Sequence, residues 1–328
     1  MNIEPQQKSR RHRWVGWVFL VATLVTVLTV VLNRAWIYDW YRGVSYQPAA
    51  EMMNIRDDLN LTNKGRFLFD ASQPELNDAE DFNRNCRQDE SEIAVLGCYA
   101  LGNIYVYNIT DNELDGIREL TAAHELLHAV WARMSNDEKA ALRPILEQAY
   151  EDNLGILKED IETYDESERI EEVFVRAGTE VKTLPNELEK YYTEIFADRN
   201  RIVNFYDGYI VVFREIEERM QVLISEIEVL GAEINAAMAA YEAQASQLEA
   251  DVVSFNSCAE VVGCFGSDSE FYLQRANLMT RQDELETLNV QINKMITEHN
   301  SKVEEYNANV TESRKLQNII NSNSVVEM

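Results

Sequence analysis

Three patterns of hydrophobic residues follow one another along the chain. Residues 14–32 form an apolar run without a charge, which as a helix is long enough to cross about 28 Å of hydrocarbon. Residues 33–199 alternate short apolar runs with polar turns, and residues 200–320 repeat apolar positions at spacings of three and four. These patterns predict one transmembrane helix, a globular domain and a long coiled coil, in that order.

Within residues 33–199, local periodicity predicts several helices and two strands. The strands are expected at Arg66–Asp70 and at Gly102–Thr110, which are rich in aromatic and β-branched residues. Capping-box patterns at Thr110–Glu113 and Ser135–Glu138 predict two helix starts. The expected helices are Pro48–Leu61, Pro74–Asn85, Leu114–Met134, Ser135–Tyr150 and Ser167–Lys182, with a turn at Pro185.

The coiled-coil region contains two heptad runs separated by a break. One apolar seam runs from Ile216 to Phe255 and a second from Leu285 to Val310. The break at residues 257–269 is rich in Gly, Ser, Asp and Cys. It predicts the tip of an antiparallel helical hairpin whose arms are on the order of 60–80 Å long. Two separate long helices that dock on the globular domain are the alternative.

The charges beside the apolar run predict its orientation. Residues 1–13 carry four basic side chains and one acidic side chain, and positively charged flanks stay in the cytoplasm. We therefore expect a cytoplasmic stub at 1–13, a membrane helix at 14–32, and outside it the globular domain at 33–199, the hairpin at 200–320 and a tail at 321–328. A cleaved signal peptide is the competing interpretation, but its apolar core would be shorter and no A-x-A site follows Leu32.

Aromatic residues mark both ends of the predicted membrane helix. Tryptophan and tyrosine gather where a protein crosses the boundary between lipid and water. The residues of this kind that flank the run are Trp14, Trp17, Trp36, Tyr38, Trp40 and Tyr41. They strengthen the interpretation of residues 14–32 as an uncleaved anchor.

The charge of the chain argues against nucleic acid as a partner, and its cysteines indicate an oxidising compartment. The chain has 57 acidic and 30 basic residues, a formal net charge of -27. Such a surface repels phosphate backbones, so nucleic acid is not expected as a partner. All four cysteines follow the apolar run, and an even count in an oxidising compartment predicts two disulfides, most simply Cys86–Cys98 and Cys258–Cys264. A structural zinc site is the alternative, but no C-x-x-C spacing is present.

The sequence His124-Glu125-Leu126-Leu127-His128 lies within the predicted helix 114–134. Residues i and i+4 stand one above the other on a helix, so both imidazoles can bind one zinc ion from a rigid element. Glu125 can then act as general base toward a water that the metal activates. A buried polar pair on an ordinary helix and a degenerate site without catalysis are the alternatives.

The motif resembles that of the zincin metallopeptidases, which carry HExxH on an active-site helix beneath an edge strand. The resemblance covers about residues 102–182, and it implies an α+β catalytic domain with a small sheet in a chain that is mainly α. The longer metzincin motif does not fit, because Trp131 and Met134 stand at its additional positions. The stretch from Leu96 to His124 is also similar to uncharacterised bacterial membrane-anchored proteins with a coiled-coil ectodomain.

A carboxylate is expected as the third zinc ligand, because only His299 follows the motif among the histidines. This is the pattern of the gluzincin branch. Helix 167–182 offers Glu168, Glu171, Glu172 and Glu180. Glu172 is favoured, because Glu-Val-Phe resembles the ligand glutamate of gluzincins and the apolar residues that follow it. Glu180 is the second choice.

Together these residues predict a membrane-anchored, zinc-dependent metallopeptidase that acts outside the cytoplasm, with Glu125 as the catalytic base. The strand at 102–110 is expected to pair with an extended peptide or protein substrate. Tyr191, Tyr192 and Arg176 are candidates to stabilise the oxyanion.

The alternative function is a non-catalytic envelope scaffold with structural zinc. In that case the coiled-coil hairpin binds an envelope protein or a second copy of the chain. Glu125 between the two histidines favours catalysis, because a structural zinc site is closed by four protein ligands and needs no base beside the metal.

Overall fold

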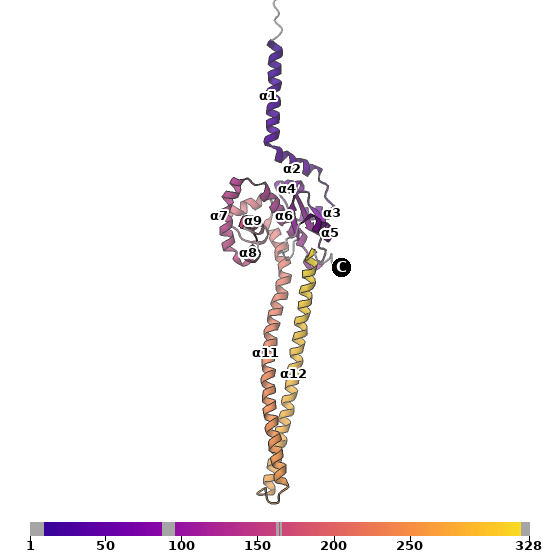
Figure 1. The fold of residues 1–328 in the computed structure, drawn as a ribbon, viewed down its shortest axis with the longest axis vertical. Coiled ribbons are helices and arrows are strands. Elements are labelled where there is room, and N and C mark those ends of the chain that lie inside the picture. The colour runs from indigo at the N-terminus through magenta and orange to yellow at the C-terminus, as the bar shows by residue number, and fades with distance from the viewer. Residues whose placement is uncertain (1–9, 87–95, 162–163, 165, 323–328) are drawn as a thin grey trace, which may run out of the picture. The chain divides into compact units, whose positions relative to one another are not determined.

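The computed structural model describes residues 10–86, 96–161, 164 and 166–322, which are mostly helical with one small sheet (Figure 1). The predicted mainly α class with a small sheet is confirmed. The chain divides into two compact units, and the second is Val212–Gln317, while the first holds the chain up to Val211 and from Asn318 onward. Residues 1–9 of the predicted stub and 323–328 of the predicted tail lie outside the described residues.

Helices make up most of the first unit. In chain order they are α1 (Arg10–Leu32), α2 (Arg34–Ser45), α3 (Ala50–Asp58), α4 (Asn63–Ala71), α5 (Ala79–Asn85), the 3-10 turn η1 (Asn112–Leu114), α6 (Ile117–Arg133), α7 (Asn136–Asp152), α8 (Leu154–Ile161), α9 (Glu166–Glu180) and α10 (Asn186–Thr193). The first turns of α11 (Arg199–Ala259) also belong to this unit.

The sheet has three short strands in the order β1-β3-β2. β3 (Asn103–Tyr107) pairs in parallel with β1 (Glu75–Asn77) and antiparallel with β2 (Gly97–Ala100). Ile104 and Val106 of β3 are buried, and their neighbours along the strand are only partly buried, which is the alternation expected of a half-buried strand. Because β3 pairs with both other strands, it is the central strand, and β2 forms one edge of the sheet.

The strand predicted at Arg66–Asp70 is wrong, because this segment belongs to α4. Thr62 starts the helix by accepting a hydrogen bond of 3.0 Å from the backbone N–H of Gly65. The helix then buries the adjacent residues Leu68 and Phe69. Two neighbouring buried positions fit the broad apolar face of a helix, whereas a half-buried strand buries every second residue.

Other predicted elements are present with different ends. The segment expected as a helix at Pro74–Asn85 divides into β1 and α5, and the Thr110–Glu113 pattern starts only η1. The capping box at Ser135–Glu138 is confirmed with both of its reciprocal hydrogen bonds. Neither β2 nor α8 was predicted.

α6 is the central helix of the first unit and packs against α9, β2 and β3. Its inner face is fully buried at Ala122, Ala123, Leu126, Leu127 and Ala129. On α9, the ring of Phe174 lies 5.2 Å from that of Trp131. Gly178 approaches Leu127 so closely that a side chain there would clash with it. These contacts fix the height of α9 along α6.

α1 carries the apolar run predicted to cross a membrane, and its residues from Val18 to Leu32 are exposed. Among the described residues, no single helix is long and apolar enough to count as a membrane span. The segments Trp17–Leu32 and Arg34–Ser45 meet the criterion only as a pair, and they are bent by 70° relative to each other.

The second unit consists of the long helices α11 and α12 (Asp268–Ile320). Ion pairs join Asp251 to Arg281 near the connection and Glu226 to Lys302 farther from it, so the helices run antiparallel. Exposed ion pairs of this kind contribute little to stability. The helices are held together by an apolar seam that buries Ile216, Leu223, Ile234, Leu285 and Ile292.

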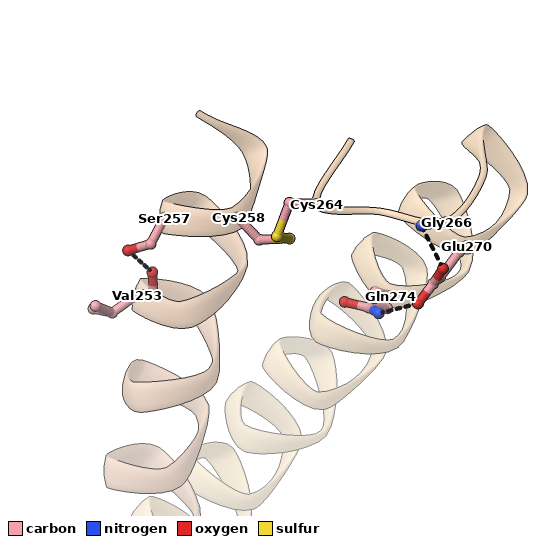
Figure 2. The surroundings of a disulfide bond; sticks show 7 residues. All are labelled: Val253, Ser257, Cys258, Cys264, Gly266, Glu270 and Gln274. Atoms are coloured by element: carbon pink, nitrogen blue, oxygen red, sulfur yellow. Dashed lines mark hydrogen bonds between the residues drawn. A yellow bond between two sulfur atoms is a disulfide. The ribbon is translucent and has the colours of Figure 1, made fainter. Parts of the chain in front are cut away.

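Residues 260–267 connect the two long helices, and Figure 2 shows this tip. The disulfide Cys258–Cys264 ties the connection to the last turn of α11. The backbone N–H of Gly266 donates a hydrogen bond of 2.8 Å to Glu270 in the first turn of α12. Three aromatic rings with centroids 5.2 Å apart pack around this turn: Phe255, Phe265 and Phe271.

The other disulfide, Cys86–Cys98, lies in the first unit. It joins the residue that follows α5 to the edge strand β2. Both predicted pairings are confirmed, and no cysteine is free. Because Cys98 follows Gly97 directly, this bond fastens β2 beside the site described below.

Candidate metal centre

Two histidines of α6 stand on the same side of that helix. α6 begins after Gly116, whose φ of 87° is in the left-handed region that favours glycine. It ends at Arg133, so the HExxH motif lies within its regular turns. The ring centroids of His124 and His128 are 5.1 Å apart, as expected for residues i and i+4.

α9 brings Glu172 to the two imidazoles. Its Oε1 atom is 3.7 Å from Nε2 of His124, and its Oε2 atom is 3.5 Å from Nε2 of His128. Ligand atoms of the three residues lie within 4.8 Å of one another. Neighbouring ligands of a tetrahedral zinc ion, with bonds of about 2.0–2.2 Å, are about 3.3–3.6 Å apart. The spacing therefore fits an ion of this size after small side-chain movements.

The chemistry of the donor set agrees with this spacing. Two neutral imidazoles and one carboxylate are ligands that zinc and other divalent transition metals accept. Three protein ligands leave a fourth position of a tetrahedral ion for water or substrate. His124, His128 and Glu172 could thus hold a metal ion.

Glu171, the neighbour of Glu172, holds the second histidine from its other side. Its Oε1 atom lies 2.8 Å from Nδ1 of His128. A carboxylate only accepts hydrogen bonds, so this contact keeps a proton on Nδ1 and leaves Nε2 to face Glu172. The sequence indicated Glu171 only as a minor ligand candidate, because its orientation depends on how α9 packs against α6.

The three central residues have different protonation states in the metal-free site. Burial lowers the pKa of His124 to about 4, despite the opposing charge of Glu172. Burial also disfavours charge on His128, but hydrogen bonds to Glu171 and Glu172 and the charge of Glu125 outweigh it and raise the pKa of His128 to about 10. Burial of Glu172 is outweighed by His124, His128 and Arg176, which lower its pKa to about 2.

These pKa shifts predict how metal affinity depends on pH. At neutral pH His128 is protonated in the metal-free site, so a binding ion must displace one proton from it. Below the raised pKa of His128, the affinity for zinc is therefore expected to rise by about tenfold per pH unit between about pH 6 and pH 8. Calorimetry in buffers of different ionisation enthalpy measures the released proton. Zinc binding without proton release would contradict the protonated state of His128.

Glu125 lies between α6 and the edge strand β2. Its side chain is buried, and a Cβ atom placed on Gly97 would be 2.8 Å from both Cγ and Oε1 of Glu125. Real Cβ atoms essentially never approach other atoms within 3.0 Å, so only glycine lets β2 pass this close. The backbone of the edge strand consequently runs directly beside the carboxylate of Glu125.

Two other candidates from the sequence, Glu180 and Glu168, do not face the histidines. Glu180 forms two hydrogen bonds with Arg176, at 2.9 and 3.0 Å, and it is not part of the three-residue cluster. Glu168 is exposed. Among the candidates from the sequence, Glu172 is the carboxylate that clusters with both histidines, and its role as third ligand stays a prediction.

Two expectations about the surroundings of the site are wrong. Tyr192 is fully buried and donates its hydroxyl to the carbonyl oxygen of Phe174 at 2.6 Å, so it cannot reach an oxyanion. The strand expected to pair with substrate, β3, already has a hydrogen-bonded neighbour on each side. The two other oxyanion candidates also have partners in the protein. Arg176 binds Glu180, and Tyr191 is partly buried against the core.

Comparison with known protein families, with curated proteins and with solved structures finds no match to this chain. The interpretation of the site therefore depends on its geometry and on the chemistry of its residues.

Proposed function

We propose that this chain is a membrane-anchored metallopeptidase that holds zinc through His124, His128 and Glu172 and hydrolyses peptide bonds outside the cytoplasm. The observation that carries the proposal is a cluster of three metal ligands with a buried glutamate, Glu125, on the same helix. A structural zinc site needs a fourth protein ligand and no base. In the described part of the chain the cluster comprises three residues, which is the ligand number of catalytic sites.

In the proposed reaction the protein residues have separate tasks. His124, His128 and Glu172 would hold a zinc ion, which would supply Lewis acidity and a site water whose pKa is about 7. Glu125 takes a proton from the water as the water oxygen bonds to the carbonyl carbon of the peptide, and passes this proton to the amide nitrogen as the C–N bond breaks. Glu171 keeps His128 oriented throughout. The products are a carboxylate and an amine.

Substrate pairing is assigned to β2. β2 is an edge of the sheet, and its residue Gly97 lies against Glu125. An extended peptide that adds to this edge through backbone hydrogen bonds would bring a carbonyl group close to the base. Any side chain at Gly97 would clash with Glu125, so only glycine keeps the backbone of this edge so close to the base.

The membrane location is supported by α1. Its apolar residues from Val18 to Leu32 are exposed in the described structure. The basic residues that precede them in the sequence favour a cytoplasmic N-terminus. The parts of both units that follow α1 would then lie in the oxidising compartment, in agreement with the two disulfides.

Metal removal tests the proposal on the purified full-length chain in detergent. We expect about one zinc per chain by mass spectrometry, cleavage of members of a broad peptide library, loss of cleavage with 1,10-phenanthroline and recovery when zinc is added. The non-chelating isomer 1,7-phenanthroline is the matched control. Cleavage that persists in metal-free protein would show that the activity does not depend on this site.

A scaffold function is the second candidate, and the hairpin tip favours it. Val261 and Val262 are 61% and 104% exposed, on a connection that the disulfide Cys258–Cys264 holds in place. Residues 220–274, which lead to and include the tip, contain nine acidic and no basic residues. Such an acidic surface with an apolar end fits a partner protein that carries basic residues around an apolar pocket.

A further inference from the structure

α2 has its polar side toward the protein and its apolar side outward. Asp39, Arg42 and Gly43 are half-buried, and their spacing places them on one face. The opposite face carries Ile37, Trp40, Tyr41 and Val44, which are 36%, 49%, 66% and 69% exposed. Trp36 and Tyr38 lie at the two borders between the faces, and both are 59% exposed. A helix on the surface of a water-soluble domain has the reverse arrangement.

Asp39 fastens the inner face of α2 to the metal-binding helix. Arg133, the last residue of α6, donates two hydrogen bonds of 3.0 Å to the carboxylate of Asp39. The same guanidinium donates to the hydroxyl of Tyr99 on β2 at 3.0 Å. Paired, charge-assisted bonds of this kind fix orientation as well as position. α2 is thereby joined to both α6 and the edge strand beside Glu125.

Arg42 makes a second attachment one turn later. Its Nε atom donates to the carbonyl oxygen of Ala71 at the end of α4, at 2.7 Å. One of its terminal nitrogens donates to the carbonyl oxygen of Gly102 in the β2–β3 turn, at 3.0 Å. Rotating α2 to bury its aromatic face would break the contacts of both Asp39 and Arg42. The outward direction of this face is therefore built into the fold of the first unit.

We propose that α2 lies in the interface of a lipid bilayer as an in-plane helix, with its aromatic face among the lipid headgroups. Tryptophan and tyrosine prefer this zone, and in-plane helices bury their apolar face by about 5–10 Å. α2 follows the exposed apolar helix α1 after the single residue Asn33 and is bent by 70° from it, so the two apolar surfaces are continuous.

This inference rests on the proposed membrane anchor and adds a second, independent contact with lipid. A single spanning helix would leave the attached domain free to rotate and tilt. A second helix in the interface, joined to α6 by Asp39 and Arg133, holds the metal-binding helix in a fixed orientation beside the bilayer.

Tryptophan fluorescence of the full-length chain in phosphatidylcholine vesicles tests the inference. The five tryptophans are Trp14, Trp17, Trp36, Trp40 and Trp131. The variant W14F/W17F keeps the α2 pair, and W36F/W40F keeps the α1 pair. Trp131 is buried and gives the common background, measured in the variant that lacks the other four. Lipids brominated near the top or near the end of the acyl chain quench from the membrane, and iodide quenches from water.

For W14F/W17F we expect a blue-shifted emission that iodide spares, with stronger loss of fluorescence from the upper bromine than from the deeper one. If iodide but not lipid quenches the α2 pair, and lipid quenches the α1 pair, the inference is overturned and the anchor stays intact. Protection from both quenchers also overturns it, because a second copy or another protein then covers the face. If lipid quenches neither pair, the proposed anchor fails as well.

Discussion

Replacing Glu125 by glutamine is expected to reduce peptide hydrolysis by about 10²–10⁴-fold while zinc content stays near one per chain. Glutamine keeps the size and much of the hydrogen bonding of glutamate, but it cannot accept the proton of the attacking water. Glu125 is absent from the ligand cluster, so the metal should remain. Zinc analysis and kcat/KM for a peptide cleaved by the wild type measure the two effects.

Glu119→Gln is the matched control, because Glu119 lies in the first turn of the same helix and outside the motif. The same chemical change there should leave hydrolysis near the wild-type rate. If Glu125→Gln hydrolyses as fast as Glu119→Gln, the assignment of the base is wrong. If the wild type holds zinc, cleaves nothing and behaves as the variant does, the scaffold function is favoured.

The histidine pair could be predicted from the sequence because it depends only on local geometry. His124 and His128 are four residues apart, and any regular helix places such residues on one side. The helix itself was predicted from the capping-box pattern at Thr110–Glu113, which in the structure starts only the short turn η1 before α6. The structure shortens it to Ile117–Arg133 without moving the motif out of its regular turns.

The sequence narrowed the candidates for the third ligand to the glutamates of one helix, but helix periodicity does not decide which of them binds the metal. Residues turn by about 100° along a helix, so Glu172 and Glu180 lie only about 80° apart around the axis of α9, but about 12 Å apart along it. Which of them meets the histidines depends on the height of α9 against α6. The packing of Phe174 on Trp131 sets that height, and such a contact joins residues far apart in the sequence.

The edge strand β2 was missed for a different physical reason. Its sequence, Gly-Cys-Tyr-Ala, lacks the alternation of β-branched residues that marks a strand. It is a strand because β3 pairs with it and because the disulfide Cys86–Cys98 holds it. Gly97 has no side chain to signal its role, which is to let the backbone pass beside Glu125.

Glu172→Gln is expected to weaken zinc binding by about 100-fold or more, which exceeds the 10–100-fold typical of a lost outer-shell partner. The neutral amide is a poor zinc ligand, and it also removes the negative charge that faces both imidazoles at 3.5 and 3.7 Å. His128→Ala should lose the metal entirely. Competition with a chromophoric chelator measures the affinities, and circular dichroism verifies that the variants are folded.

Glu180→Gln provides the control for this experiment, since Glu180 lies on the same helix and is almost as buried, at 8% exposure against 4% for Glu172. Its carboxylate binds Arg176, so the substitution should cost some stability but leave zinc affinity nearly unchanged. The comparison separates loss of a ligand from general loosening of α9, because both variants remove one buried negative charge from that helix. The reverse result, with zinc lost in Glu180→Gln and kept in Glu172→Gln, would transfer the ligand role to Glu180.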